Sequence, residues 1–357
     1  MQLSRLVAAA AFAVLATPSA QAGTFEVSRT LAWPTAADFR GCAANTSHLN
    51  DRGEVAAGCD YQFVKFGLNP ATLLFGFYGV QRSKLLFWGA AATSAKVVSN
   101  PSGHSNDSLW VSGLSNTGQA LVYAGANANY MWGSAGWQQI KFSGEQQVRS
   151  LAPTGEVLGD VYGHNLEFWR NGVLTPWAIP AGYWYATGEA PNGPLVLSKD
   201  GDFEQLYTWR PGRTPELMPV PEGRRREYVS GVNASGQFAL TTTNPAAVPG
   251  SSAAELDRRL HLYDGQRFVD MPDNGQGEFN LLKLSAGGQA LVQQTLLASG
   301  THEDWLYAGG QWTSLRRAVT LPTGVVYDQA ITVNGLGQLL IQAKQGTRTV
   351  FLVCVPN

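Results

Sequence analysis

The amino-acid sequence predicts an all-β protein, specifically a seven-bladed β-propeller of four-stranded antiparallel blades. Three observations lead to this prediction: a glycine turn between apolar positions recurs seven times, an aromatic strand follows each turn, and charge is scarce. Only 14% of the 357 residues are charged and 40 are glycine. That composition suits short strands joined by tight turns better than helix bundles or disordered chain.

The chain begins with the features of a secretory signal peptide. Arg5 precedes an apolar run of 11 residues, Leu6–Ala16, and Ala20 and Ala22 form the small-residue pattern of a signal peptidase site. The run is too short for a membrane-spanning helix, which needs about 20 residues. We therefore expect residues 1–22 to be removed, and residues 23–357 to form a single domain of a secreted or periplasmic protein.

The repeat is a hairpin built around a turn glycine. The residue four positions before the glycine is apolar in six of the seven copies, and the residue three before it is small or Asn. The residue three after it is always apolar. A glycine between two such strands supplies the positive φ that a tight turn needs. The turn glycines are Gly53, Gly118, Gly155, Gly193, Gly236, Gly288 and Gly337.

An aromatic strand that usually ends at glycine follows each turn. Examples are Leu86–Gly89, Tyr130–Gly133 and Leu306–Gly309, and a short fourth strand is expected next, as at Trp137–Ile140 and Gln311–Leu315. After the first interval, the turn glycines lie 37 to 52 residues apart, a spacing typical of propeller blades. A lone blade cannot bury both of its faces, whereas a ring of blades buries them and leaves only short edges.

The two ends of the chain are expected to meet. The seventh repeat stops after its aromatic strand, Phe351–Val353, whereas Thr24–Leu31 alternates apolar residues and belongs to no blade. We therefore expect Thr24–Leu31 to complete the last blade and close the ring. The first interval is longer, 65 residues from Gly53 to Gly118, and contains an extra apolar segment, Thr72–Tyr78. No turn-glycine motif accompanies it, which favours an insertion in the first blade over a degenerate eighth blade.

The three cysteines offer a disulfide. In an oxidising compartment Cys42 and Cys59 can close a small loop at the start of the fold. Cys354 is then left as a buried thiol in the last strand, although it can pair with either of the others if the chain ends meet. No His lies at ligand spacing beside the cysteines, so neither a metal site nor a cofactor is expected.

The repeats resemble those of the extracellular HAF-repeat proteins. Their units run approximately as Asn-x-x-Gly-x-Val-x-Gly, followed by an aliphatic–aromatic–Trp strand that ends at Gly, and the resemblance covers nearly all of residues 23–357. The His-Ala-Phe triplet that names the family is not kept, and the nearest segment is His164–Trp169. That family is functionally uncharacterised, so the resemblance implies fold and secretion more than activity.

A binding site is expected at one mouth of the central tunnel. The glycine hairpins share one face of the ring, so the longer loops, where binding residues concentrate, lie on the other. Eight residues before each turn glycine stands an aromatic or carboxamide residue. Such side chains suit a neutral polyhydroxylated ligand, although they can also plug the tunnel or bond to strand ends. The seven are Asn45, Trp110, Gln147, Tyr185, Tyr228, Asn280 and Gln329.

Two charged segments are weaker candidates. His302 with Glu303 or Asp304 would suit a metal or an acid–base pair, and Arg224–Arg226 would suit a phosphate. In both places we expect the ordinary alternative, a solvated loop or turn. The sequence contains no G-x-S-x-G, H-E-x-x-H or P-loop motif.

These features favour a non-catalytic module that binds a glycan or a protein partner. A hydrolase or lyase at the tunnel mouth is the alternative, which convergent carboxylates would distinguish, and a scaffold of the cell envelope is another. The net charge is −1, so we expect no attraction to nucleic acid or acidic membranes. We also expect no membrane insertion and a monomer.

Overall fold

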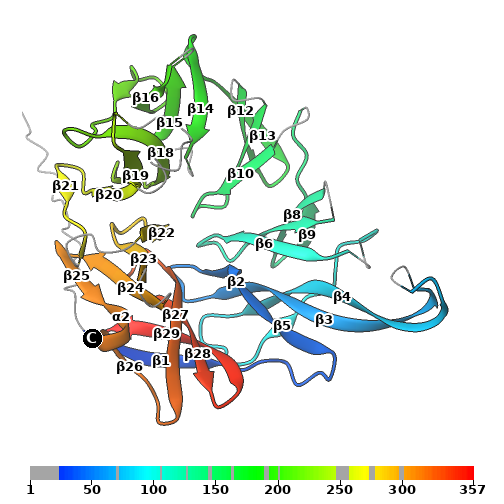
Figure 1. The fold of residues 1–357 in the computed structure, drawn as a ribbon. Coiled ribbons are helices and arrows are strands. Elements are labelled where there is room, and N and C mark those ends of the chain that lie inside the picture. The colour runs from blue at the N-terminus through cyan, green and yellow to red at the C-terminus, as the bar shows by residue number, and fades with distance from the viewer. Residues whose placement is uncertain are drawn as a thin grey trace, which may run out of the picture.

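The computed structural model arranges the chain as a ring of antiparallel sheets (Figure 1). It describes residues 24–357 apart from several short segments, so the signal peptide predicted over residues 1–22 lies outside the described residues. No helix in the described part of the chain has the length and apolar character to span a membrane. The segments left out are 1–23, 70–71, 105–106, 126–127, 144–146, 162–164, 189–192, 200–201, 247–256, 273–277 and 297–300.

The described residues form seven sheets, six of four strands and one of five. In the four-stranded sheets, consecutive strands pair antiparallel in chain order. Sheet one contains β2 (Phe39–Leu49), β3 (Val55–Leu68), β4 (Phe75–Trp88) and β5 (Lys96–Val97); sheet two contains β6 (Leu109–Leu114), β7 (Ala120–Ala124), β8 (Ala128–Gly133) and β9 (Gly136–Gln139); sheet three contains β10 (Gln147–Leu151), β11 (Val157–Val161), β12 (Asn165–Arg170) and β13 (Val173–Ala178).

The remaining sheets follow the same order, except that the last one also takes up the start of the chain. Sheet four contains β14 (Tyr183–Thr187), β15 (Leu195–Lys199), β16 (Asp202–Trp209) and β17 (Glu216–Leu217); sheet five contains β18 (Arg225–Val232), β19 (Phe238–Thr243), β20 (Arg259–Tyr263) and β21 (Phe268–Val269); sheet six contains β22 (Glu278–Leu284), β23 (Ala290–Leu296), β24 (Thr301–Ala308) and β25 (Gln311–Ser314); sheet seven contains β27 (Val325–Val333), β28 (Leu339–Gln345), β29 (Arg348–Pro356), β1 (Phe25–Leu31) and β26 (Val319–Thr320).

The glycine turns join the first two strands of each sheet, as the repeat predicts. Six of the seven turn glycines have φ between 76° and 99°, a region that other residues enter only with strain. The residue three before the glycine links neighbouring turns. The Asn50 side chain donates to the Ser115 carbonyl (2.7 Å), and the Asn334 side chain donates to the Asn50 carbonyl (2.8 Å). The small-or-Asn column therefore reflects hydrogen bonds between neighbouring sheets.

The chain ends close the ring. Strand β1 pairs antiparallel with β29, so the prediction that Thr24–Leu31 completes the last blade is confirmed. The Ser28 hydroxyl donates to the Val353 carbonyl (2.9 Å), and the Asn357 N–H donates to the Thr24 carbonyl (3.0 Å). The sequence did not predict the four-residue helix α2 (Leu315–Ala318) or strand β26, which pairs parallel with β1.

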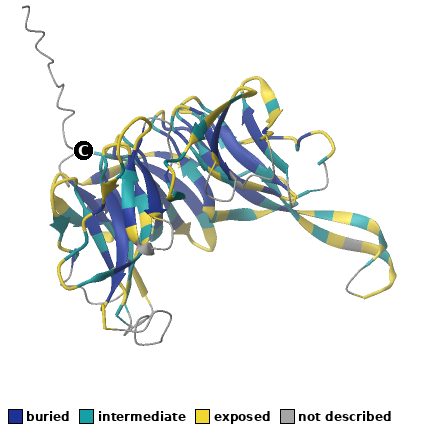
Figure 2. Cartoon of the chain, turned by 90° about the horizontal axis from the view of Figure 1, so that it is seen from above, coloured by how far each residue is buried: buried dark blue, intermediate teal, exposed yellow. Residues whose placement is uncertain are grey.

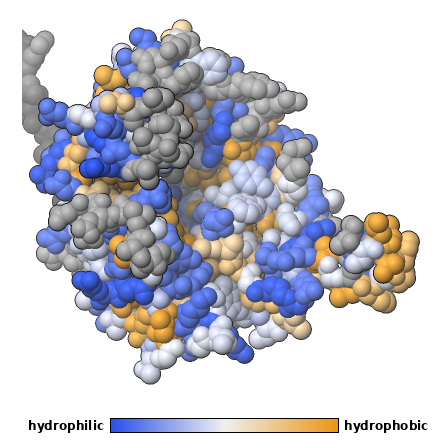
Figure 3. Space-filling model, viewed as in Figure 1, coloured by the Kyte–Doolittle hydropathy of each residue, from blue (hydrophilic) through white to orange (hydrophobic). Residues whose placement is uncertain are grey.

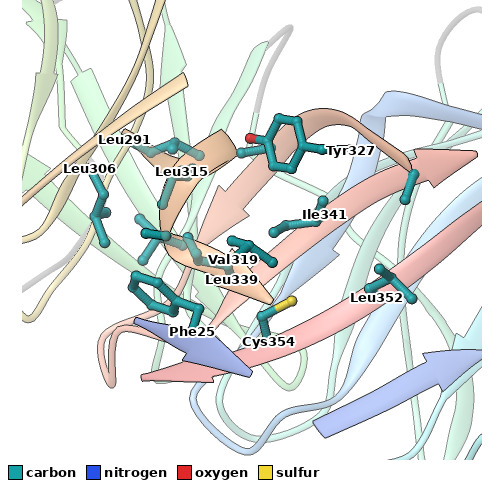
Figure 4. Packing of buried hydrophobic residues seen from close by; sticks show 14 of the residues in the cluster. Phe25, Leu291, Leu306, Leu315, Val319, Tyr327, Leu339, Ile341, Leu352 and Cys354 are labelled. Atoms are coloured by element: carbon teal, nitrogen blue, oxygen red, sulfur yellow. The ribbon is translucent and has the colours of Figure 1, made fainter. Parts of the chain in front are cut away.

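Apolar clusters fill the space between neighbouring sheets. Leu31 and Phe351 of sheet seven pack with Val55 and Trp88 of sheet one, and none of these four side chains exceeds 1% exposure. A second cluster joins β1, α2 and β29 to sheet six, as Figure 4 shows around Phe25, Leu315 and Cys354. Both junctions lie where the chain ends meet, so closure buries core as well as pairing strands.

The cysteines pair as their spacing suggested. A disulfide joins Cys42 of β2 to Cys59 of β3. Cys354 is free and buried, and burial raises the pKa of its thiol to about 12. A pairing of Cys354 with another cysteine is thereby excluded.

The long first interval forms a hairpin that projects from the ring. Strands β3 and β4 are each 14 residues long and pair along their whole length, from Val55 opposite Trp88 to Leu68 opposite Phe75. The extra apolar segment is therefore an insertion in sheet one and makes no eighth sheet. We call residues 62–69 and 72–81 the arm. Figures 1 and 2 both show it extending beyond the other sheets.

Candidate functional site at the tunnel mouth

The first strands of six sheets surround a central cavity of about 620 Å³. Strands β2, β6, β10, β18, β22 and β27 all contribute lining residues. A smaller cavity of about 100 Å³ adjoins it on the side of the glycine turns. The tunnel is narrow at this end, where Asp51, Lys283 and several asparagines line the walls together with the apolar residues that stand four before the turn glycines. These residues are Leu49, Leu114, Leu151, Val232, Leu284 and Val333.

The seven predicted site residues do not form one ring around the cavity. Asn45 and Gln329 line it, and they come from the neighbouring sheets one and seven. Trp110 and Tyr228 are about half exposed, at 51% and 47%, but are not lining residues. Asn280 is likewise exposed and is not a lining residue.

Tyr185 has a structural role in its own sheet. Its ring packs against the apolar cluster between sheets three and four, and its hydroxyl donates to the Gly188 carbonyl (3.0 Å). Gln147 starts β10, and its side chain lies outside the described part. A ligand-binding role for the seven residues stays a prediction.

A β-bulge explains why strict alternation of side chains along the first strands predicted the wrong lining residues. In five of the first strands the pairing shifts by one residue at the position six before the turn glycine. The extra residue reverses the alternation of side chains before it, so the residue eight before the glycine no longer shares a face with the residue four before it. All five bulge residues line the cavity: Ser112, Arg149, Ser230, Leu282 and Ile331.

The cavity lining carries positive charge. Arg149 and Lys283 are among the lining residues, and no Asp or Glu is. Arg149 donates through Nε to the buried Asp160 carboxylate behind the cavity. Arg149 lies in the bulge column, whereas Lys283 lies five before its glycine. Because the two cations stand at different distances from their turn glycines, an alignment of the repeats does not single them out together.

His48 is a third basic residue in the lining, but it is neutral near pH 7. Burial, with a further effect from the charge of Lys283, lowers the pKa of His48 to about 4. One ring nitrogen, Nε2, lies 3.3 Å from the Val111 carbonyl, which accepts its hydrogen bond in the neutral tautomer. The fixed charges of the lining are therefore those of Arg149 and Lys283.

The first charged segment outside the tunnel is structural, and the expectation of a solvated loop there was wrong. Asp304 lies in β24 and is 2% exposed. Its carboxylate accepts hydrogen bonds from the Tyr327 hydroxyl (2.7 Å) and the Ala330 N–H (2.6 Å) of sheet seven. Burial and this carboxylate raise the pKa of Tyr327 well above its usual value. Asp304 therefore joins sheet six to sheet seven.

Arg224–Arg226 is likewise no solvated turn. Arg226 is 5% exposed and donates to the Met218 carbonyl (2.7 Å). Arg224 pairs with Asp257 (2.7 Å). Both guanidinium groups thus have partners within the protein. Within the ranges that the structure describes, no three His, Cys, Asp or Glu side chains gather as metal ligands would.

The comparisons with known proteins define the class of the fold. No protein-family model matches the chain, and no curated protein matches it. The β-propeller domain of the Trilobed protease from Pyrococcus furiosus is similar over 89% of this chain and 94% of its own, with 10% identity and a TM-score of 0.53. A structure of YCF48 bound to D1 peptide covers 95% of this chain and 99% of its own, with 13% identity and a TM-score of 0.47. The first similarity shows the fold: the chain is a β-propeller with four-stranded antiparallel sheets.

Proposed function

We propose that the chain is a secreted or periplasmic, seven-bladed propeller that binds a protein partner at the tunnel mouth without catalysing a reaction. The seven sheets support the blade count, and the disulfide and the pattern of residues 1–22 support export. The likeness of the repeats to those of HAF-repeat proteins agrees with export. The proposed ligand is an acidic segment or a chain-terminal carboxylate of the partner.

The positive lining of the cavity carries this proposal. Arg149 and Lys283 come from opposite parts of the ring and face one space of about 620 Å³, the size of an ordinary ligand pocket. The described lining residues of this space include no Asp or Glu, while Arg149 is paired with the buried Asp160 behind the cavity. The tunnel narrows at the glycine-turn end, which gives the space the form of a cup that suits the end or a bend of a peptide better than a strand that threads through.

Three alternatives have weaker support. The exposed rings of Trp110 and Tyr228 offer stacking faces, so glycan binding is the second candidate. A hydrolase or lyase would need paired carboxylates at the mouth, and the described lining supplies none. An envelope scaffold would use the same protein-binding property.

Fluorescence anisotropy with a labelled glutamate-rich peptide tests the proposal. Lys283→Gln should weaken binding roughly tenfold, since one charge pair across an interface is typically worth that much or more. Arg170→Gln is the matched control, because Arg170 is an exposed arginine paired with Glu156 on an outer strand. Arg149→Lys is preferred to Arg149→Ala, because it keeps a charge beside buried Asp160.

Equal affinity in Lys283→Gln and wild type would overturn the cup as the binding site. Binding on a glycan array that Trp110→Ala with Tyr228→Ala abolishes would replace the peptide with a sugar. Melting curves of every variant exclude loss through unfolding.

A further inference from the structure

The far end of the arm exposes more apolar surface than any other part of the described chain. Seven of its large apolar side chains are between 46% and 79% exposed. Figure 3 shows them as an orange group at the end of the projecting hairpin, away from the ring. Monomeric proteins rarely leave so continuous an apolar patch in water. The seven are Val64, Phe66, Leu68, Leu73, Leu74, Phe75 and Phe77.

Strand pairing gathers these side chains at the tip. Phe66 stands opposite Phe77 and Leu68 opposite Phe75, so they share one face of the ribbon. The rings of Phe66 and Phe77 lie 5.0 Å apart. Leu73 and Leu74 continue the apolar surface over the turn. The apolar group therefore covers a face and also the outermost end of the arm.

The turn at the tip bonds part of its own backbone. The Asn69 N–H donates to the Leu74 carbonyl (2.9 Å), and the Leu73 N–H donates to the Asn69 carbonyl (2.7 Å). Because these backbone groups are already hydrogen-bonded, moving the turn out of water costs less free energy than moving an open loop would. The outer edges of a two-stranded ribbon still carry unpaired backbone groups, which restricts any contact with lipid to the interfacial layer.

Positive charge accompanies the apolar tip: Lys65 stands between Val64 and Phe66, and Arg82 and Lys84 lie at the base of the arm. Between Tyr61 and Leu85 the sequence contains Lys65, Arg82 and Lys84 and no Asp or Glu. The neighbouring Asp60 accepts hydrogen bonds from the side chains of Gln81 (2.8 Å) and Ser83 (2.5 Å) at the base of the arm. The net charge of −1 for the whole chain conceals this local excess.

Aromatic rings accompany these cations. The Lys84 ammonium lies 5.4 Å from the ring centre of Tyr61 and 5.0 Å from that of Phe63. From tip to base, the hairpin thus presents mainly apolar side chains, with Lys65 among them, and then aromatic rings with Arg82 and Lys84. That order matches the order of acyl chains, interface and anionic headgroups in a bilayer.

We propose that the arm tip inserts into the interfacial layer of an anionic lipid membrane and holds the propeller at its surface. A groove on a protein, or the arm of a second copy, would match the apolar face. Neither accounts for the cations of this hairpin, Lys65 beside the apolar side chains and Arg82 and Lys84 at the base, with no Asp or Glu between Tyr61 and Leu85. The proposal concerns a surface separate from the tunnel, so it stands or falls independently of the proposed peptide binding.

Vesicle sedimentation with the chain from residue 24 onward tests the proposal. Vesicles of phosphatidylcholine with phosphatidylglycerol should bind the protein, and binding should fall at high salt because the charges are exposed. Phe66→Ser with Phe77→Ser should weaken binding about tenfold or more, from the apolar area lost at the interface. Val173→Ser with Leu336→Ser, two exposed apolar residues elsewhere, is the matched control. Lys65→Gln with Lys84→Gln should weaken binding to anionic vesicles and leave the weak binding to pure phosphatidylcholine unchanged.

A fluorescent label reports the position of the tip. Leu74→Cys would offer one accessible thiol, because Cys354 is buried and the other cysteines form a disulfide. An environment-sensitive dye there should brighten and shift to the blue on vesicles. No dye response, or equal sedimentation of the tip variant and wild type, would overturn the proposal. So would a concentration-dependent dimer in light scattering that the Phe66 and Phe77 changes abolish, since a second copy would then cover the tip.

Discussion

Asp304 shows how one buried carboxylate holds two blades together. It accepts hydrogen bonds from Tyr327 and the Ala330 N–H, and Gln293 of its own blade donates to its other oxygen (3.1 Å). The sequence predicted a solvated loop there, because only one His lies nearby for a metal or acid–base site. The pattern of one strand does not show which groups the next blade will bring to it.

Replacing Asp304 should destabilise the ring strongly. Asp304→Ala leaves a buried hydroxyl and a buried N–H without an acceptor, so we expect a loss of about 3 kcal/mol in the free energy of unfolding. Asp328→Ala removes a partly exposed carboxylate beside Lys344 and should cost less than about 1 kcal/mol. Urea denaturation measures both. A similar cost for the two variants would contradict the role given to Asp304.

The two buried histidines should make stability depend on pH. Burial, with nearby cations, lowers the pKa of both His48 and His261 to about 4. Between pH 6.5 and about 4 the unfolded chain therefore binds protons that the folded chain does not, and stability falls as the pH falls. Melting temperatures measured from pH 7.5 to 4.5 should decline less steeply in the double variant His48→Gln with His261→Gln. Parallel declines in the variant and wild type would show that other groups dominate.

At the scale of elements, strand β1 does more than fill an edge. Its Arg29 is 9% exposed and donates to the Gly53 and Gly89 carbonyls of blade one. Trp33, just beyond it, packs on Trp88 and Phe351. The start of the chain therefore connects blade seven to blade one through pairing, hydrogen bonds and aromatic contacts.

Deleting residues 24–31 should lower the melting temperature sharply. The deletion exposes the edge of β29 and opens the junction that buries Leu31 and Phe351. A chain that starts at residue 24 is the reference, and calorimetry is the measurement. A melting temperature within a few degrees of the reference would contradict closure by this strand.

The elements were easier to predict than the site. The glycine turns, the aromatic strands and the borrowed last strand follow from local pattern and from the need to bury both faces of each sheet. The lining of the tunnel depends on bulges such as those at Ser112 and Arg149, which shift the register by one residue. Strict alternation therefore pointed to Trp110 and Tyr228 in place of the bulge residues. A bulge leaves no clear mark in a single sequence, because almost any residue can occupy it.

For the whole molecule, the ring and the arm should behave as separate parts. The apolar clusters lie between blades, and none of them contains the arm residues from Val64 to Phe77. Replacing residues 64–79 with a two-residue turn, the shortest common hairpin loop, should change the melting temperature by only a few degrees. A large drop in differential scanning calorimetry would mean that the arm supports the ring.

The same separation bears on the charge of the molecule. A net charge of −1 led us to expect no attraction to acidic membranes. The arm with its base carries Lys65, Arg82 and Lys84, and the tunnel lining carries Lys283 and the Asp160-paired Arg149. Local charge, placed by the fold, therefore gives the molecule two surfaces of a kind that its composition does not reveal.

The meeting of the chain ends makes the propeller topologically a circle that happens to be cut within blade seven. Thr24 and Asn357 are joined by a hydrogen bond, so a short linker could connect them without moving a strand. The circle could then be cut between two sheets, for example between Ser102 and Gly103 in the exposed turn that follows sheet one, to give a circular permutant with the same sheets. Its last blade would be assembled from one continuous stretch of chain, whereas here Ser28 must find a partner 325 residues away. Such a permutant should fold faster, since no sheet then requires strands from opposite ends of the chain to pair.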